Sequence, residues 1–288
     1  MKIVTDSGAD LPLAEAEALD ITVAPLFIQF PEGEIKSSDI EHDAFYDRLE
    51  AMVPDVPTTA QPSPGMFGEI YTKLAAKGEE ILSVHISSGL SGTLQSARLG
   101  SEAVVDTAVN LIDSLTLSGA QRFQVLAAAW AAQAGWSKEA IIEQLDRIRA
   151  ASEIIYTLET LDYLARGGRI GRVQALAGSL LKLKPIIKVD KADGKYTSVG
   201  KSRTLKKAMA LMVDHLAQTY GSTPLWVSVL HGRMPEQAQA LVEAMKAQLS
   251  VGKLEILRVS PVLGVHTGPG VVGTAVLPLD LVSGLLPG

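Results

Sequence analysis

Short apolar runs alternate with longer segments of helical periodicity along the first half of the chain. The runs at 2–5, 81–86 and 109–112 have the length and the β-branched content of buried strands, and a further strand is predicted at 21–28. In the segments 66–74 and 137–150, apolar residues recur every three or four positions, which favours helices with one buried face. Ser137 is the predicted N-cap of the second helix. Strands that alternate with helices predict a mainly parallel sheet flanked by helices.

The second half of the chain has a less regular pattern. A strand at 153–158 leads to a short helix that ends at Gly167-Gly168, and Asp193-Gly194 predicts the turn of a β-hairpin. Further strands are predicted at 185–189, 195–199, 225–230, 254–259 and 271–277, and helices are predicted from Thr204 onward and at 235–249.

The length of the chain favours two domains or one large domain. It has 288 residues, of which 47% are hydrophobic, and a typical domain has ~100–200 residues. We predict the α/β class with two α/β domains. The first, 1–155, has a mainly parallel sheet flanked by helices, and the second, 156–288, has a smaller mixed sheet with helices.

Composition and charge exclude several classes of protein. The formal net charge is −6 and no long basic run is present, which argues against a nucleic-acid partner. The absence of cysteine excludes disulfides, thiolate chemistry and cysteine-based metal sites. The N-terminus turns polar by Thr5, and the most apolar stretch, 125–136, is too short to span a bilayer. We expect a cytoplasmic protein with at most transient membrane contact.

Four polar loops at the ends of predicted strands are candidates for chemistry. They are Asp6-Ser7, Thr58–Pro62, Ser87–Thr93 and Gly264–Gly270. The Ser87–Thr93 loop joins a strand to a helix with four hydroxyls and two glycines, a composition that suits anion binding. Each loop is also explained by a plain turn or helix cap, although core packing is a poor explanation for a histidine in the glycine-rich turn 264–270.

Other chemical motifs are missing from the sequence. No phosphate-binding P-loop, no G-x-S-x-G nucleophile elbow, no H-E-x-x-H motif and no cluster of metal ligands can be found. Gly268, Gly270 and Gly273 match a dinucleotide-binding spacing, but no helix or acidic ribose ligand is predicted to follow them.

The polar loops, in this order, resemble the motifs of the DegV family. The resemblance rests on Ile3–Ser7 with Asp10–Pro12, on Thr58–Ser63, on Ser87–Thr93, on Leu164–Ile170 and on His266–Gly270. It extends from residue 1 to about residue 278. Five motifs in register are far more specific than any one of them.

The resemblance implies a fold and a function. It implies two α/β domains with a long-chain fatty acid between or within them, and no cofactor or metal. It further implies that the chain is not an enzyme by itself. It would be the lipid-presenting subunit of a bacterial fatty-acid kinase that supplies phospholipid synthesis, and a separate ATP-binding subunit would phosphorylate the carboxylate.

The resemblance also assigns residues. Thr59 and Ser91 would bind the carboxylate, with Gly92 and Thr93 in the supporting loop. Arg203 and His266 would face the acyl phosphate or the partner. The list of departures is short: Ala60 stands where the family often has Ser, and Thr267 replaces a commonly aliphatic residue.

Physical chemistry gives reasons for such a site. Each buried methylene of the tail contributes ~0.8 kcal/mol, so an apolar tunnel can hold a long chain tightly. Two neutral hydroxyls can donate to the carboxylate and, unlike a lysine, leave its oxygen able to attack a γ-phosphate.

Two alternatives remain open at this stage. One is an acyl hydrolase that uses Ser91 as nucleophile, His266 as base and Asp6 as the group that orients the base. The other is a binding module whose Ser87–Thr93 loop holds a phosphorylated metabolite. Acyl chain length, oligomeric state, the physiological kinase and the roles of Asp6 and Ser7 cannot be read from the sequence.

Overall fold

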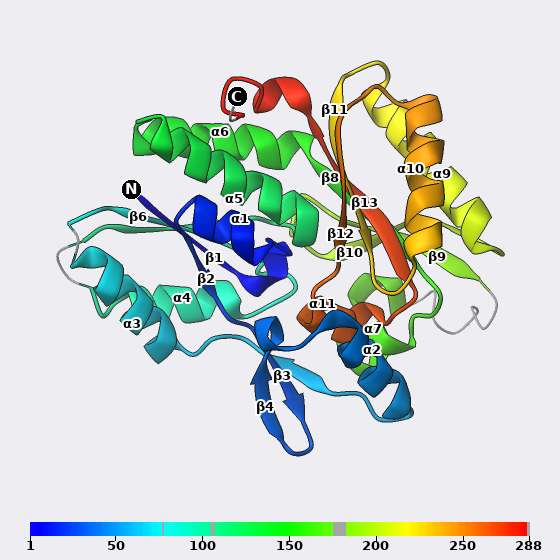
Figure 1. Ribbon diagram of the computed structural model, residues 1–288, viewed down its shortest axis with the longest axis horizontal. Helices are drawn as coiled ribbons and strands as arrows, with labels where there is room; N and C mark the ends of the chain where they lie inside the picture. Colours follow the sequence, from blue (N-terminus) through cyan, green and yellow to red (C-terminus); the bar gives the residue numbers. More distant parts are fainter. Residues whose placement is uncertain (77, 105–106, 175–182, 287–288) are drawn as a thin grey trace.

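The computed structural model describes residues 1–76, 78–104, 107–174 and 183–286, which form two main sheets and one small sheet (Figure 1). The first main sheet has four strands and all of its pairs are parallel. Its strands, in sheet order, are β2 (Ile21–Ala24), β1 (Lys2–Asp6), β6 (Ile81–His85) and β7 (Val109–Asp113). The predicted parallel sheet is confirmed.

The second main sheet is mixed, as predicted, and has six strands. Its order is β10 (Tyr196–Ser202), β9 (Lys184–Val189), β8 (Glu153–Leu158), β13 (Val271–Pro278), β11 (Leu225–His231) and β12 (Val251–Arg258). Only β11 and β12 pair in parallel. The prediction that this sheet is the smaller one is wrong, because the predicted hairpin and all the other strands of the second half join one sheet. The domain boundary at 155 falls within β8 and stays a prediction.

The small sheet corrects two predictions. It consists of β4 (Gly33–Lys36), β3 (Phe27–Phe30) and β5 (Thr58–Ala60). The single strand predicted at 21–28 is in fact two strands in different sheets, separated at Pro25, which has no N–H for a ladder. The predicted loop around Thr59 contains the short strand β5, which pairs Thr59 with Ile28.

Helices form layers on both faces of each main sheet (Figure 1). They are α3 (Pro64–Ala75) and α4 (Thr93–Ser101) on the first sheet, and α9 (Leu205–Tyr220) and α10 (Pro235–Gln248) on the outer face of the second. Helix α5 (Ser118–Gln133) lies between the two sheets, where it contacts β1 and β6 on one side and β8 and β13 on the other. Helix α6 (Lys138–Ala151) packs against α5, and Ser137 caps it as predicted by accepting a hydrogen bond from the amide of Ala140.

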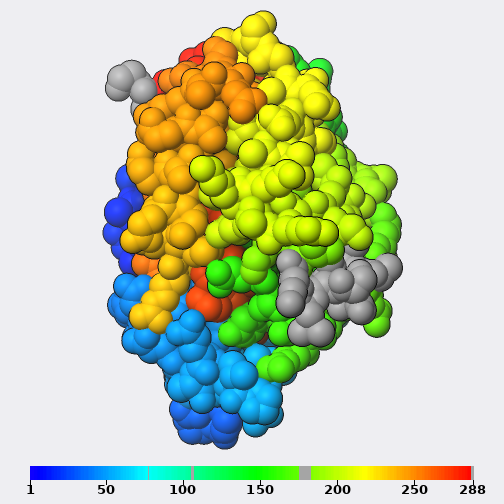
Figure 2. Space-filling view, turned by 90° about the vertical axis from the view of Figure 1, so that its right-hand side faces the viewer, coloured from blue at the N-terminus to red at the C-terminus, as the bar shows by residue number. Residues whose placement is uncertain are grey.

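Two helices were not predicted. Helix α2 (His42–Ala51) and helix α11 (Pro261–Thr267) pack against each other, and Figure 2 shows α9 and α10, in yellow and orange, above the light-blue segment that carries α2. The turn predicted at 264–270 is therefore wrong at its start. Pro261 opens a helix that ends at Thr267 and is followed by Gly268, whose φ is +72°.

The remaining described helices are α1 (Leu13–Ala18) and α7 (Asp162–Arg166). Among the helices that the structure describes, none combines the length and the apolar character needed to cross a membrane.

Candidate functional site

A polar pocket lies where the N-terminal loops meet α11 and the start of β10. Its cavity volume is about 40 Å³, which is more than the ~10–15 Å³ that one water molecule needs. We call it the polar pocket, and its lining consists of Leu26, Thr59, Ile86, Leu90, Ser91, Arg169, Tyr196, Val262, Leu263 and His266. Three of the residues that the sequence singled out, Thr59, Ser91 and His266, are thus brought together.

Thr59 and His266 form a direct hydrogen bond across this pocket. The Thr59 Oγ1 atom lies 2.9 Å from Nε2 of His266. Burial, which is the larger cause, and the nearby Arg169 guanidinium together lower the pKa of His266 to about 4. The imidazole is therefore neutral at neutral pH. When its Nε2–H donates to Thr59, the hydroxyl proton of Thr59 is free for a ligand.

Glycine at position 167 allows the end of α7 to approach this histidine. A Cβ atom at Gly167 would lie 2.3 Å from Nδ1 of His266, closer than any real contact. Nδ1 itself has no hydrogen-bond partner among the described residues. Helix α7 therefore packs directly on the imidazole and holds it toward Thr59.

The loop after β6 supplies a second hydroxyl. Ser91 Oγ lies 2.8 Å from Oγ1 of the buried Thr93, the first residue of α4. A donation from Thr93 to Ser91 leaves the Ser91 proton free. Gly92 packs against Gln61 of the Thr59 loop, since a Cβ there would lie 3.1 Å from the Gln61 amide nitrogen. The loop that carries Ser91 and the loop that carries Thr59 therefore pack directly against each other.

The cation at the pocket is a residue that the sequence analysis did not assign. Arg203 is exposed, lies between β10 and α9, and does not line the pocket. Arg169 lines it instead, and its guanidinium also donates to the carbonyl of Gly167 at 2.8 Å. The sequence did point to this region, because Arg169 belongs to the Leu164–Ile170 motif, but no residue of that motif was assigned a role.

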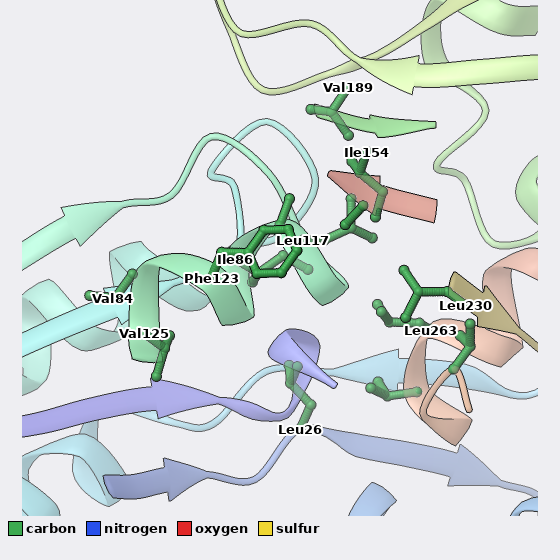
Figure 3. Packing of buried hydrophobic residues seen from close by; sticks show 14 of the residues in the cluster. Leu26, Val84, Ile86, Leu117, Phe123, Val125, Ile154, Val189, Leu230 and Leu263 are labelled. Atoms are coloured by element: carbon green, nitrogen blue, oxygen red, sulfur yellow. The ribbon is translucent and has the colours of Figure 1, made fainter. Parts of the chain in front are cut away.

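A second cavity, almost entirely apolar, adjoins the polar pocket. It has a volume of about 30 Å³ and lies between the start of α5, α11 and the inner face of the six-stranded sheet. We call it the apolar cavity, and its lining consists of Leu117, Ser118, Ile154, Tyr156, Leu230, Val259, Leu263, Thr267, Val271, Gly273 and Thr274. Leu263 lines both spaces. Figure 3 shows Leu117, Ile154, Leu230 and Leu263 gathered from four different elements.

Asp6 does not reach His266. It is fully buried, it contacts Nδ1 of His85 at 2.9 Å, and it accepts hydrogen bonds from the amides of Ile86 and Gly8. The arrangement of Ser91, His266 and Asp6 that a hydrolase would need is therefore not assembled. Asp6 instead anchors the start of the loop that carries Ser91.

Ser7 has a structural contact, since its Oγ accepts a hydrogen bond from the amide of Leu26 at 3.0 Å. Within the described ranges, no group of three or more His, Asp or Glu side chains is arranged to hold a metal ion.

Comparisons with known proteins agree on one family. The family model described as "Uncharacterised protein, DegV family" matches residues 1–279. A DegV domain-containing protein of Deinococcus radiodurans is 40% identical over 278 residues, which are 96% of this chain and 95% of the relative.

Solved structures give the same result. A DegV family protein from Thermus thermophilus, described as fatty-acid binding, matches with a TM-score of 0.90 and 30% identity over 96% of this chain and 99% of its own. DegV of Bacillus subtilis, described as a fatty acid binding protein, has a TM-score of 0.86 and 30% identity over 96% and 98%. A stearic acid-binding protein from Eubacterium ventriosum has a TM-score of 0.85 and 29% identity over 96% and 98%.

Proposed function

Since the chain belongs to the DegV family, we propose that it binds one long-chain fatty acid, with the carboxylate in the polar pocket and the tail in the apolar cavity. One observation carries the proposal. Two hydroxyls and a neutral histidine meet in a pocket that shares Leu263 with a cavity lined almost wholly by apolar groups. A hydrocarbon chain with one anionic end suits both spaces, since its anionic end matches the polar pocket and its chain matches the apolar cavity.

The polar pocket can bind a carboxylate without a tight ion pair. Thr59 and Ser91 each have a hydroxyl proton to offer once His266 and Thr93 donate to them. A hydrogen bond to a charged group contributes about 1.5–3 kcal/mol. Arg169 adds a positive charge at the rim of the same pocket. The carboxylate is thereby oriented while its oxygens remain nucleophilic.

The tail would fill the apolar cavity and extend it. The cavity lies between α5 and the inner face of the six-stranded sheet, where Leu117, Ile154 and Leu230 form its wall. Burial of each methylene contributes ~0.8 kcal/mol before ordering costs. The affinity of the complex would therefore come mainly from the tail, and its orientation from the head group.

The bound acid would be presented to a separate ATP-binding kinase subunit in the cytoplasm. In that reaction a carboxylate oxygen attacks the γ-phosphate of ATP, and ADP leaves with the electron pair of the broken bond. Arg169 and the neutral His266 are placed to stabilise the charge on the transferred phosphoryl group. The exposed Arg203 would contact the partner. The acyl phosphate would then supply phospholipid synthesis.

Binding is tested by the double change Thr59→Ala plus Ser91→Ala. We expect solvent extraction and mass spectrometry of the wild-type protein to release a long-chain fatty acid. The double variant should bind oleate at least ~100-fold more weakly, because two charge-assisted hydrogen bonds are lost. The matched control is Thr72→Ala plus Ser101→Ala, which removes the same groups from the surfaces of α3 and α4.

Presentation is tested with a kinase subunit and ATP, by trapping acyl phosphate with hydroxylamine. The wild-type protein should support acyl phosphate formation and the double variant should not. Wild-type binding and wild-type phosphorylation in the double variant would contradict the head-group assignment. Absence of any bound fatty acid, with no uptake of added oleate, would contradict the proposed function itself.

A further inference from the structure

The Ser87–Thr93 loop is bonded to a turn of the second main sheet. This turn, residues 190–195 between β9 and β10, is called the hairpin turn below. The fully buried Ser87 donates a hydrogen bond from its Oγ to the carbonyl of Gly194, 107 positions away, at 2.8 Å. Ser87 lines neither the polar pocket nor the apolar cavity, so its role lies in this contact.

Two glycines allow the loop and the hairpin turn to approach each other this closely. A Cβ atom at Gly194 would lie 1.8 Å from Oγ of Ser87, and one at Gly89 would lie 2.5 Å from the carbonyl oxygen of Asp193. The φ of Gly194 is +65°, a conformation that favours glycine. The main chains of the loop and the turn are therefore in direct contact, with the Ser87 hydroxyl between them.

The hairpin turn is itself held in place. Inside the turn, the carbonyl of Asp190 accepts a hydrogen bond from the amide of Gly194 at 2.8 Å. Outside it, Arg172 pairs with the Asp190 carboxylate at 3.2 Å, and Arg172 lies three positions after Arg169, which lines the polar pocket. The turn is thus anchored next to the segment that carries Arg169, and it can in turn hold Ser87.

Ser87 passes this position on to Ser91 through its main chain. Its carbonyl accepts hydrogen bonds from the amides of Leu90 and Ser91, both at 3.0 Å, and its Oγ accepts one from the amide of Gly89 at 3.1 Å. Ser91 lines the polar pocket, where its hydroxyl is placed to donate to a carboxylate. Two hydrogen bonds therefore connect Ser91 to Gly194, and Ser87 makes both of them.

We propose that Ser87 is a positioning residue of the head-group site, which fixes the Ser91 hydroxyl relative to the hairpin turn. The proposal rests on the fatty-acid function proposed above and deepens it. Without the Ser87 hydroxyl, the loop loses its bond to the turn, and the Ser91 hydroxyl is no longer held in one direction toward the carboxylate. A misdirected donor binds poorly, because a hydrogen bond weakens steeply as its angle departs from linearity.

A double-mutant cycle on the full-length, delipidated protein tests this role, with palmitate as the ligand and calorimetry as the measurement. Ser87→Ala should weaken palmitate binding about fivefold in the wild-type background, because the hydrogen bond from Ser91 becomes weaker. In the Ser91→Ala background the same change should weaken binding by less than about twofold, because the hydroxyl that Ser87 positions is already absent. A merely structural role of Ser87 would give the same factor in both backgrounds.

The carboxylate itself gives a second measurement, by carbon-13 NMR of palmitate labelled at its carboxyl carbon. In the complex with Ser87→Ala, the carboxyl resonance should move from its wild-type position in the same direction as in Ser91→Ala. Gly89→Ala breaks the contact with the hairpin turn from the other side of the loop and should move the resonance in that direction too.

The matched control is Ser101→Ala. It removes a hydroxyl that likewise donates to a main-chain carbonyl, that of Arg98, at the far end of α4. Palmitate affinity and the carboxyl resonance should both stay at their wild-type values in this variant.

The possible outcomes separate the two levels of the proposal. Equal factors in the two backgrounds, or a carboxyl resonance that keeps its wild-type position in Ser87→Ala and Gly89→Ala, would overturn the positioning role and leave the fatty-acid function intact. Failure of palmitate to bind the wild-type protein would overturn the fatty-acid function and the positioning role together.

Discussion

Two buried histidines, each bonded to a hydroxyl, lie in different surroundings in this protein. His85 belongs to a closed chain: Asp6 contacts its Nδ1 at 2.9 Å, its Nε2 contacts Ser83 at 2.7 Å, and Ser83 contacts Tyr71 at 2.9 Å. All four side chains are inaccessible to solvent. His266 contacts Thr59, has no carboxylate partner among the described residues, and lines the polar pocket.

The difference teaches what makes a histidine catalytic, structural or ligand-binding. The first group has the carboxylate, imidazole and hydroxyl of a hydrolase triad, yet no substrate can reach it, so it serves the fold. The second has access, but a histidine without a carboxylate and with a lowered pKa is a poor general base. It is well suited to donate a hydrogen bond and orient Thr59. Access and protonation state, rather than residue types, separate the two.

The largest effect is expected from breaking the structural chain. Asp6→Ala would leave His85 without its carboxylate and the amides of Gly8 and Ile86 without their acceptor. Loss of one partner of such a buried pair costs about 3–5 kcal/mol. Urea denaturation should therefore show a large fall in the free energy of unfolding.

The control for this change is Asp43→Ala, which removes an exposed carboxylate that pairs with Arg258. Exposed ion pairs contribute about 0–1 kcal/mol, so the control should stay close to the wild type. If Asp6→Ala were no less stable than Asp43→Ala, the chain through His85 could not be a structural network.

The second effect concerns the protonation of His266. Its pKa falls from 6.5 in the unfolded chain to about 4 in the folded protein because of burial, and Arg169 adds to the shift. Between these values the unfolded chain binds the proton and the folded protein does not. The contribution of His266 to stability is therefore neutral above pH 6.5 and becomes unfavourable as the pH falls toward 4, by up to about 3 kcal/mol.

A buried carboxyl acts in the opposite sense. Burial raises the pKa of Asp10 from 3.8 to about 6, so between these values the folded protein binds the proton and the unfolded chain does not. Asp10 therefore lowers the free energy of unfolding above pH 6, and this unfavourable contribution disappears as the pH falls toward 3.8. The two groups oppose each other between about pH 4 and pH 6.

Denaturation of variants at pH 7 and pH 4.5 separates these two contributions. His266→Gln has no imidazole to protonate in the unfolded chain. Between pH 7 and pH 4.5, its free energy of unfolding should therefore rise by about 2 kcal/mol relative to that of the wild type. Asp10→Asn has no buried carboxylate that can be protonated as the pH falls. Its free energy of unfolding should therefore fall by a similar amount relative to that of the wild type. If the free energy of unfolding depended on pH in the same way in His266→Gln and in the wild type, the pKa of His266 would not be lowered in the folded protein.

Sequence reasoning succeeded where the pattern was local. The alternation of strands and helices gave the parallel sheet. The predicted polar segments contain Asp6, which ends β1, Thr59, which lies in β5, and Ser91, which follows β6. The glycine-rich appearance of 264–270 was misleading. Gly264 is helical and makes room for Phe45, whose Cε1 would lie 2.7 Å from a Cβ there. That reason involves α2, which is far away in the sequence.

The rest of the site depended on contacts between distant segments. Arg169 belongs to the Leu164–Ile170 motif, but the motif alone does not show that its side chain, rather than that of the exposed Arg203, lines the pocket. In the same way, the histidine that contacts Asp6 is His85, 79 positions away, whereas the acyl-hydrolase alternative had paired Asp6 with His266. Residue types can therefore be predicted from loops, but their pairing is set by the packing of α7, α11 and the two sheets.

The smallest effect sharpens the role of the ligand-binding histidine. Gly167→Ala would place a methyl group 2.3 Å from Nδ1 of His266, and the ring, which borders a pocket, can move away from it. Movement of the ring weakens its hydrogen bond to Thr59, so fatty-acid binding should fall by about tenfold, the equivalent of one ordinary hydrogen bond. Gly65→Ala, whose Cβ would lie 3.8 Å from its nearest neighbour, is the matched control and should bind normally. Competition with oleate measures both variants. If Gly167→Ala bound as tightly as Gly65→Ala, the contact between His266 and Thr59 would not orient the ligand, and the two histidines would differ only in their exposure.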